Sequence, residues 1–136
     1  MSETELQVMV ADYIKLAYPD VLFHSDFGSG IRLTPGQAKK QKRQNGGIRG
    51  WPDMFIAEPT WDKNRNKDYR GLFIELKKDG TRLKKRNGEW ASEHIAEQNE
   101  MLERLEFRGY AAHFAIGFDE AKKIIDNYLG GKDGNI

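Results

Sequence analysis

The chain of 136 residues contains no cysteine and only three histidines, and these shortages narrow the kinds of site that it can hold. Without cysteine there can be neither a disulfide nor a thiolate zinc site. His24, His94 and His113 are too scattered along the sequence to indicate a zinc site. No apolar run approaches the roughly 20 residues of a membrane span. The start of the chain is polar and acidic, unlike a signal peptide, so we expect a cytoplasmic protein.

The length is that of one domain with at most a short appendage. We expect a single domain over residues 1–130, with a basic insertion at about 35–49 and a flexible tail over 131–136. No internal repeat is visible in the sequence.

The net charge of +1 conceals a strong asymmetry along the chain. Residues 32–90 hold 16 Lys/Arg and 7 Asp/Glu, a net charge of +9, and the remaining residues hold 6 and 14, a net charge of −8. A basic segment of this size suits a polyanionic partner such as DNA. A lysine-rich loop region that only faces water is the plainer alternative, since most charge runs are of that kind.

The segment 71–78 indicates a short strand that carries charge in its second half. Side chains alternate along a strand, so Phe73, Glu75 and Lys77 share one face. A carboxylate in a buried strand is costly unless a cation compensates it, and Lys77 or a metal ion could do so. Alternatively, this is an edge strand whose Glu75 and Lys77 face water.

A second acid, Asp53, follows the turn formed by Gly50, Trp51 and Pro52 and precedes the apolar strand 54–57. If the strands 53–57 and 71–78 pair as neighbours, Asp53 and Glu75 can converge on one hard cation. Few protein carboxylates together with retained waters are typical of a Mg²⁺ site.

The helical segments are marked by caps and by apolar spacing. Ser2 and Glu5 fit a capping box before a helix that runs to about Tyr18, with a predicted buried stripe of Leu6, Met9, Val10, Tyr13 and Ala17. Thr34 and Pro35 start a short polar helix over residues 35–44. A further helix runs from Ser92 to Arg108, and a last one begins at the cap Asp119 and ends at Gly130–Gly131. The other predicted elements are strands at 21–24 and 110–116 and a long turn at 58–70.

Gln98 falls on the apolar face of the helix that Ser92 caps, between Ile95 and Leu102. It is either a boundary residue bonded to backbone or a polar group delivered to the site of the two acids. The element order predicts an α/β fold, a mixed central sheet flanked by helices.

These features together resemble the VRR-NUC family, a branch of the PD-(D/E)xK nucleases, over residues 3 to about 129. The matching residues are Glu5 on the first helix, Gly50-Trp51-Pro52-Asp53, Ile74-Glu75-Leu76-Lys77, Glu97-Gln98, and Gly109-Tyr110. The resemblance implies a restriction-endonuclease-like core and Mg²⁺- or Mn²⁺-dependent hydrolysis of phosphodiester bonds in DNA. Stand-alone phage and bacterial members resemble structure-selective nucleases that act as homodimers on junctions, including Holliday junctions.

The resemblance also implies roles for single residues. Asp53, Glu75 and the Leu76 carbonyl would hold the metal ion, with Glu5 directly or through water. Lys77 would orient the attacking water or neutralise charge, and Gln98 would support Lys77 or the water. Backbone phosphates would be bound by basic residues on both sides of the acids: Arg32, Lys39, Lys40, Lys42, Arg43, Arg49, Lys84, Lys85 and Arg86.

Two other functions fit the same sequence. One is a restriction-type endonuclease that cuts at a fixed base sequence, although no recognition domain is evident in a chain this short. The other is a DNA-binding or assembly module that keeps the fold without cleaving. The intact Asp53, Glu75 and Lys77 favour an active enzyme over the module.

Overall fold

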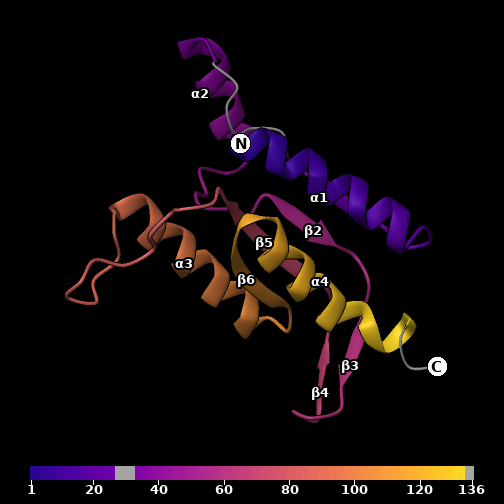
Figure 1. Ribbon diagram of the computed structural model, residues 1–136. Helices are drawn as coiled ribbons and strands as arrows, with labels where there is room; N and C mark the ends of the chain where they lie inside the picture. Colours follow the sequence, from indigo (N-terminus) through magenta and orange to yellow (C-terminus); the bar gives the residue numbers. More distant parts are fainter. Residues whose placement is uncertain (27–32, 134–136) are drawn as a thin grey trace.

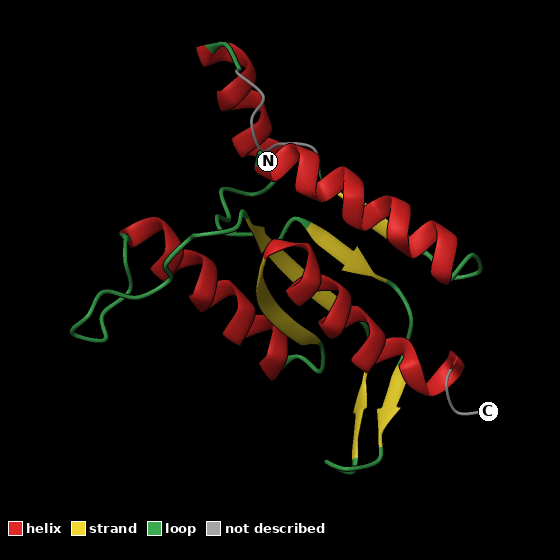
Figure 2. Ribbon diagram, in the orientation of Figure 1, coloured by secondary structure: helices red, strands yellow, loops and turns green. Residues whose placement is uncertain are grey.

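The structure is a computed structural model, and it describes residues 1–26 and 33–133, with side chains described as far as Gly130. Its helices and strands follow the predicted order, with one addition (Figures 1 and 2). They are α1 (Glu3–Ala17), β1 (Phe23–Ser25), α2 (Pro35–Gln44), β2 (Met54–Ile56), β3 (Thr60–Asp62), β4 (Lys67–Tyr69), β5 (Leu72–Lys77), α3 (Glu93–Phe107), β6 (Ala111–Ile116) and α4 (Gly117–Asp133).

A four-stranded mixed sheet in the order β1-β2-β5-β6 forms the centre of the fold. The pairs β1–β2 and β2–β5 are antiparallel, and β5–β6 is parallel. Helix α3 connects the two parallel strands, as a crossover between parallel strands requires. The predicted mixed sheet flanked by helices is therefore confirmed.

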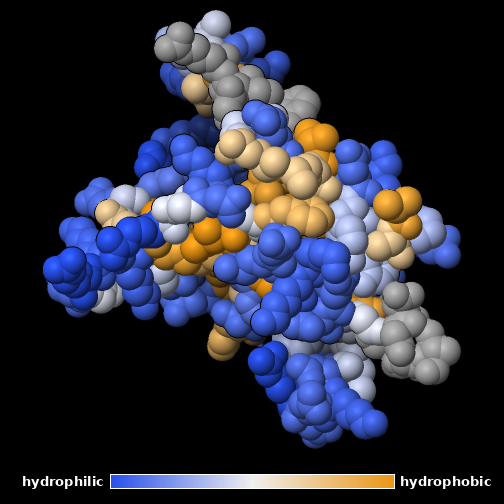
Figure 3. Space-filling model, in the orientation of Figure 1, coloured by the Kyte–Doolittle hydropathy of each residue, from blue (hydrophilic) through white to orange (hydrophobic). Residues whose placement is uncertain are grey.

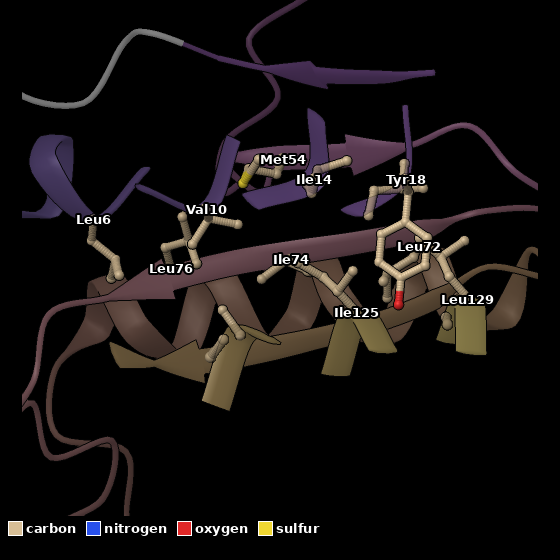
Figure 4. Packing of buried hydrophobic residues seen from close by; sticks show 14 residues of the cluster. Leu6, Val10, Ile14, Tyr18, Met54, Leu72, Ile74, Leu76, Ile125 and Leu129 are labelled. Carbon is tan, nitrogen blue, oxygen red and sulfur yellow. The ribbon is translucent and has the colours of Figure 1, made fainter. Parts of the chain in front are cut away.

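Two hydrophobic layers hold the helices on opposite faces of the sheet. Alternation along β5 sends Leu72, Ile74 and Leu76 into the larger layer, with α1 and α4. Figure 4 shows the side chains of α1 and α4 meeting these three residues. The other face of the sheet packs against α3 through a smaller cluster that includes Phe73 and Ala112.

The buried stripe of α1 is narrower than predicted. Leu6, Val10 and Ile14 are its buried residues, whereas Met9 is 38% exposed. A spacing of four residues along a helix keeps side chains on one face, and this face meets β5. Tyr13 lies at the margin, where its hydroxyl donates a hydrogen bond to Asp126 of α4.

Two sequence predictions were wrong, one about the segment at 58–70 and one about the ends of the last helix. The predicted long turn at 58–70 contains a second small sheet, the antiparallel pair β3–β4, because two short polar strands face each other across the turn at 63–66. Helix α4 begins at Gly117 instead of after a cap at Asp119, and it continues through Gly130–Gly131 to Asp133. The side chain of Glu120 accepts a hydrogen bond from the backbone N–H of Ile116 and so takes the capping role.

Helix α2 projects beyond the N-terminal end of α1 (Figure 1), and all ten of its residues are exposed. Its start is fixed by a capping box in which Thr34 and Gln37 bond each other's backbone N–H groups. The face drawn in Figure 3 is mostly hydrophilic, with apolar patches along α1, whose exposed apolar residues include Val8 and Leu16. None of the helices in the described ranges is long and apolar enough to cross a membrane.

Candidate active site

Asp53 directly precedes β2 and lies across from Glu75 of β5. The register pairs Met54 with Ile74, so the next position outward in this antiparallel pair places Asp53 opposite Glu75. The Oδ2 atom of Asp53 accepts a hydrogen bond from the backbone N–H of Leu76 at 2.8 Å. The loop residue is thus attached to the strand that carries the second acid.

Glu75 is 4% exposed and has two polar contacts through one of its oxygens. Its Oε2 atom accepts a hydrogen bond from Nε2 of Gln98 at 2.9 Å and lies 3.7 Å from Nζ of Lys77. Lys77 is 6% exposed and Gln98 is 5% exposed, so this polar cluster is buried. The structure therefore brings Asp53, Glu75, Lys77 and Gln98 together, and the alternative of an edge strand facing water is excluded.

Burial makes both carboxyl groups hold protons more tightly than free carboxyls, and the charge of Asp53 adds to this effect at Glu75. Burial, then the Asp53 charge, raises the pKa of Glu75 to about 9, against the opposing effect of Lys77. Burial likewise raises the pKa of Asp53, although the hydrogen bond from the Leu76 N–H opposes it. Two acids with raised pKa values in one buried site are typical of functional centres.

The residues present fit a hard divalent cation. The Oε1 atoms of Glu75 and Gln98 are both buried and have no hydrogen-bond partner among the residues that the structure describes. A cation would bind the free Glu75 oxygen and replace the proton that the pair otherwise retains. Within the described residues no cluster of three or more His, Cys, Asp and Glu could hold a metal ion. Mg²⁺ commonly binds one or two protein carboxylates and keeps several waters, so the two carboxylates of Asp53 and Glu75 are sufficient for a Mg²⁺ site.

The Leu76 carbonyl is directed toward the same pair. In a strand, the N–H and C=O of one residue point to the same side, and the Leu76 N–H points to Asp53. Strand β2 begins at Met54, so it does not extend far enough to pair with Leu76. The carbonyl is therefore on the side where the predicted ligand set requires it.

Glu5, the predicted acid of the first helix, does not join the site. Its side chain is exposed and accepts a hydrogen bond from the Ser2 hydroxyl, and its backbone N–H donates to Ser2. Glu3 on the same helix is half-buried, and its charge makes one of the smaller contributions to the raised pKa values of Asp53 and Glu75. Glu3 precedes Leu6 by three residues, so extending the buried stripe of α1 backward could have found it.

The predicted DNA-binding residues in the described ranges lie in three places. These are helix α2, the segment between α2 and Asp53, and the loop at 78–92. Lys39, Lys40, Lys42 and Arg43 lie on α2, and Arg49 lies 4.0 Å from Glu97 with its side chain 71% exposed. Lys85 and Arg86 are exposed in the loop at 78–92, and Lys84 covers the ring of Trp90 at 4.7 Å from its centroid. Arg32 lies outside the described residues.

The loop at 78–92 is ordered by its own hydrogen bonds. Lys84 and Trp90 form an isolated antiparallel bridge. The backbone N–H of Lys85 donates to the Glu89 carbonyl at 2.7 Å, and that of Ala91 donates to Leu83 at 2.8 Å. The exposed Lys85 and Arg86 therefore lie in a hydrogen-bonded turn of the segment that joins β5 to α3 (Figure 1).

Comparison with known proteins finds a likeness among solved structures. No protein-family model matches the sequence, and the search of curated proteins finds no significant match. A solved structure of a "VRR_NUC domain protein" has a TM-score of 0.62 and 29% sequence identity to the chain, and the match covers 96% of this chain and 89% of the other. This likeness supports a VRR-NUC domain, in agreement with the resemblance that the residues at 50–53 and 74–77 indicate.

Proposed function

We propose that this protein is a DNA endonuclease that depends on Mg²⁺ or Mn²⁺ and prefers branched or junction DNA. The observation that carries the proposal is the pair of half-buried Asp53 and buried Glu75, with an amide and an ammonium group on the same Glu75 oxygen. The likeness to a VRR_NUC domain protein supports a nuclease.

Asp53, Glu75 and the Leu76 carbonyl would hold the ion, with Glu3 close enough to affect the pair electrostatically. The ion, when bound, lowers the pKa of a water and offsets charge developing on the phosphate. Glu75 must lose its proton for the ion to bind, because ligating carboxylates are deprotonated.

Lys77 and Gln98 act on this arrangement from the α3 side of the sheet. Gln98 donates to Glu75 and so fixes the direction of its carboxylate. The Lys77 ammonium group, 3.7 Å from Glu75, is buried in the same site and would stabilise negative charge on a phosphate or on the attacking oxygen.

The basic elements would hold DNA on either side of the acids. Helix α2 and the loop at 78–92 both extend from the end of the molecule where β5 terminates (Figure 1). Exposed lysines and arginines bind backbone phosphates, which gives affinity without reading base sequence. Selectivity for the shape of the DNA is therefore favoured over selectivity for its sequence. The resemblance to stand-alone VRR-NUC proteins adds the proposal of a homodimer, which sedimentation of the pure protein tests.

The test incubates the pure protein with duplex, flap and four-way-junction DNA, in Mg²⁺, Mn²⁺ or chelator. We expect nicking of the branched substrates only with metal, and loss of nicking in Glu75→Gln. Binding without nicking under every metal condition would favour the non-catalytic module. Cutting of plain duplex at one fixed base sequence would favour the restriction-type enzyme.

A further inference from the structure

Trp51 combines an exposed indole with a position two residues before Asp53. Trp51 is 46% exposed. Its ring centroid lies 6.0 Å from that of Phe73, which stacks on Phe55 at 4.4 Å and meets the edge of Tyr110 at 5.2 Å. The indole is therefore backed by a row of aromatic rings and retains an open surface.

The backbone on both sides of Trp51 is fixed. Gly50 has a φ of +83°, and a Cβ placed on it would lie 3.0 Å from the Glu97 carbonyl oxygen. Pro52 is buried and has a fixed φ. Trp51 is thus held between a glycine packed against α3 and a buried proline, so little conformational freedom is lost when a ligand covers its ring.

The other two tryptophans differ from Trp51 either in how much of the ring is exposed or in where the residue lies in the fold. Trp90 is half-buried, with Lys84 over its ring at 4.7 Å and Phe114 at 6.2 Å. Trp61 is 54% exposed but lies on the β3–β4 pair, at the opposite end of the molecule from the start of α3 (Figure 1). Trp51 is accordingly the tryptophan that is both open and adjacent to the acid pair, and Trp61 is a control of similar exposure.

We propose that Trp51 stacks an unpaired nucleobase next to the phosphodiester on which Asp53 and Glu75 act. This inference rests on the proposed nuclease function and specifies its substrate as DNA with unpaired nucleotides beside a duplex. A base inside a duplex has both faces covered by its neighbours, whereas an unpaired base offers a free face to an aromatic ring. Arg49, exposed two residues before Trp51, supplies positive charge for the phosphate of that nucleotide. Trp51 acts here as a specificity residue.

Stacking can be measured without cleavage. The probe is a flap DNA with 2-aminopurine as the first unpaired nucleotide, titrated with protein in chelator. We expect quenching of its fluorescence by the wild type and by Trp61→Ala, weaker quenching by Trp51→Phe, and none by Trp51→Ala. Affinity for the flap should fall roughly 5- to 150-fold in Trp51→Ala, the range for loss of one base–aromatic stack. Thermal unfolding of each variant shows that it is folded.

Cleavage gives the second measurement, the ratio of kcat/KM for flap DNA to that for duplex DNA in Mg²⁺. This ratio should fall in Trp51→Ala and stay unchanged in Trp61→Ala. If Trp51→Ala quenched the 2-aminopurine fluorescence as the wild type does and had the same ratio of kcat/KM for flap to duplex DNA, the inference would be overturned. So would a change in protomer number on sedimentation, which would assign Trp51 to a protein interface. Absence of cleavage by the wild type with any metal would instead overturn the proposed function, while the quenching experiment would still decide on stacking.

Discussion

The Oδ2 atom of Asp53 accepts a hydrogen bond from the Leu76 N–H at 2.8 Å, across 23 positions of the chain. This bond attaches the loop that ends in Pro52 to the strand that carries Glu75. Asp53 therefore has a structural role as an acceptor and a proposed chemical role as a charged ligand. Two substitutions separate these roles.

Asp53→Asn keeps an oxygen that can accept the Leu76 bond but removes the charge. We expect it to fold with near wild-type stability and to lose at least about 100-fold in metal-dependent cleavage, because a metal ligand is weakened. Asp53→Leu should also lose about 1–3 kcal/mol of unfolding free energy, because the Leu76 N–H is left without its acceptor. Urea unfolding and nicking assays measure both. Wild-type nicking by Asp53→Asn would remove this carboxylate from the reaction.

The pH dependence of stability tests the raised pKa of Glu75. Its ordinary value of 4.5 applies to the unfolded chain, and the folded value is about 9. Between these values the native state holds a proton that the unfolded chain has lost. The metal-free protein should therefore lose stability as pH rises from about 5 to 9, with a slope approaching about 1.4 kcal/mol per pH unit. Urea unfolding in chelator at several pH values measures this slope.

Glu75→Gln is the matched control, because it has no proton to release. It should lack most of the slope, leaving the smaller part that comes from the raised pKa of Asp53. Added Mg²⁺ should stabilise the wild type more at pH 8 than at pH 6, since binding displaces the proton. A wild-type stability that stays constant or rises from pH 5.5 to 8.5 in chelator would contradict the raised pKa.

The pair of Asp53 and Glu75 could be predicted from the sequence because it depends mainly on patterns within two short segments of the chain. Alternation along β5 and a short strand after Pro52 predicted that Asp53 and Glu75 could converge if their strands paired, and the register of β2 with β5 supplies that pairing. A capping residue and a metal ligand have the same chemistry at a helix start, so the sequence left both roles open for Glu5, and its hydrogen bonds with Ser2 support the capping role. Which of Glu3 and Glu5 faces the sheet depends on how α1 is rotated against β5, and that is set by the burial of Leu6, Val10 and Ile14.

The aromatic surroundings of Trp51 could not be predicted from spacing. Contacts between Trp51, Phe73 and Tyr110 join residues from three separate parts of the chain. The β3–β4 pair was missed because its three-residue strands are too short and polar to show an alternating pattern.

Gln98→Leu tests whether the buried amide supports Glu75. Leucine fits the apolar face of α3 but cannot donate to Oε2 of Glu75. We expect metal-dependent cleavage and Mg²⁺ affinity to fall about 10- to 100-fold, the usual effect of removing a partner of a metal ligand. Calorimetric titration with Mg²⁺ and nicking assays measure the two effects. Asn99→Ala, one residue further along the same helix, should change neither. Unaltered Mg²⁺ affinity in Gln98→Leu would mean that the amide is only structural.

Replacing Lys39, Lys40, Lys42 and Arg43 by glutamine tests the role of α2. These side chains are exposed, so stability should change little. If each contacts a phosphate, the slope of log affinity against log salt should become shallower by about 0.9 per lost contact on duplex DNA. Filter-binding titrations at several salt concentrations measure it. The control replaces Lys63 and Lys67 of the β3–β4 pair and should leave the slope unchanged. Equal slopes for the α2 variant and the wild type would exclude α2 from the DNA interface.

Gly50→Ala tests whether the loop before Asp53 must pack closely on α3. Its φ of +83° disfavours any side chain, and the new Cβ would lie 3.0 Å from the Glu97 carbonyl oxygen and 3.4 Å from the Gln98 Cα. We expect a loss of about 1–3 kcal/mol of unfolding free energy, together with slower cleavage, because both Asp53 and Gln98 would be displaced. A Cβ at Gly36 on α2 would meet no described residue within 4 Å, and its φ is ordinary, so Gly36→Ala should be neutral or slightly stabilising. If Gly50→Ala matched Gly36→Ala in urea unfolding and in nicking rate, close packing of this loop would not be needed to position the acids.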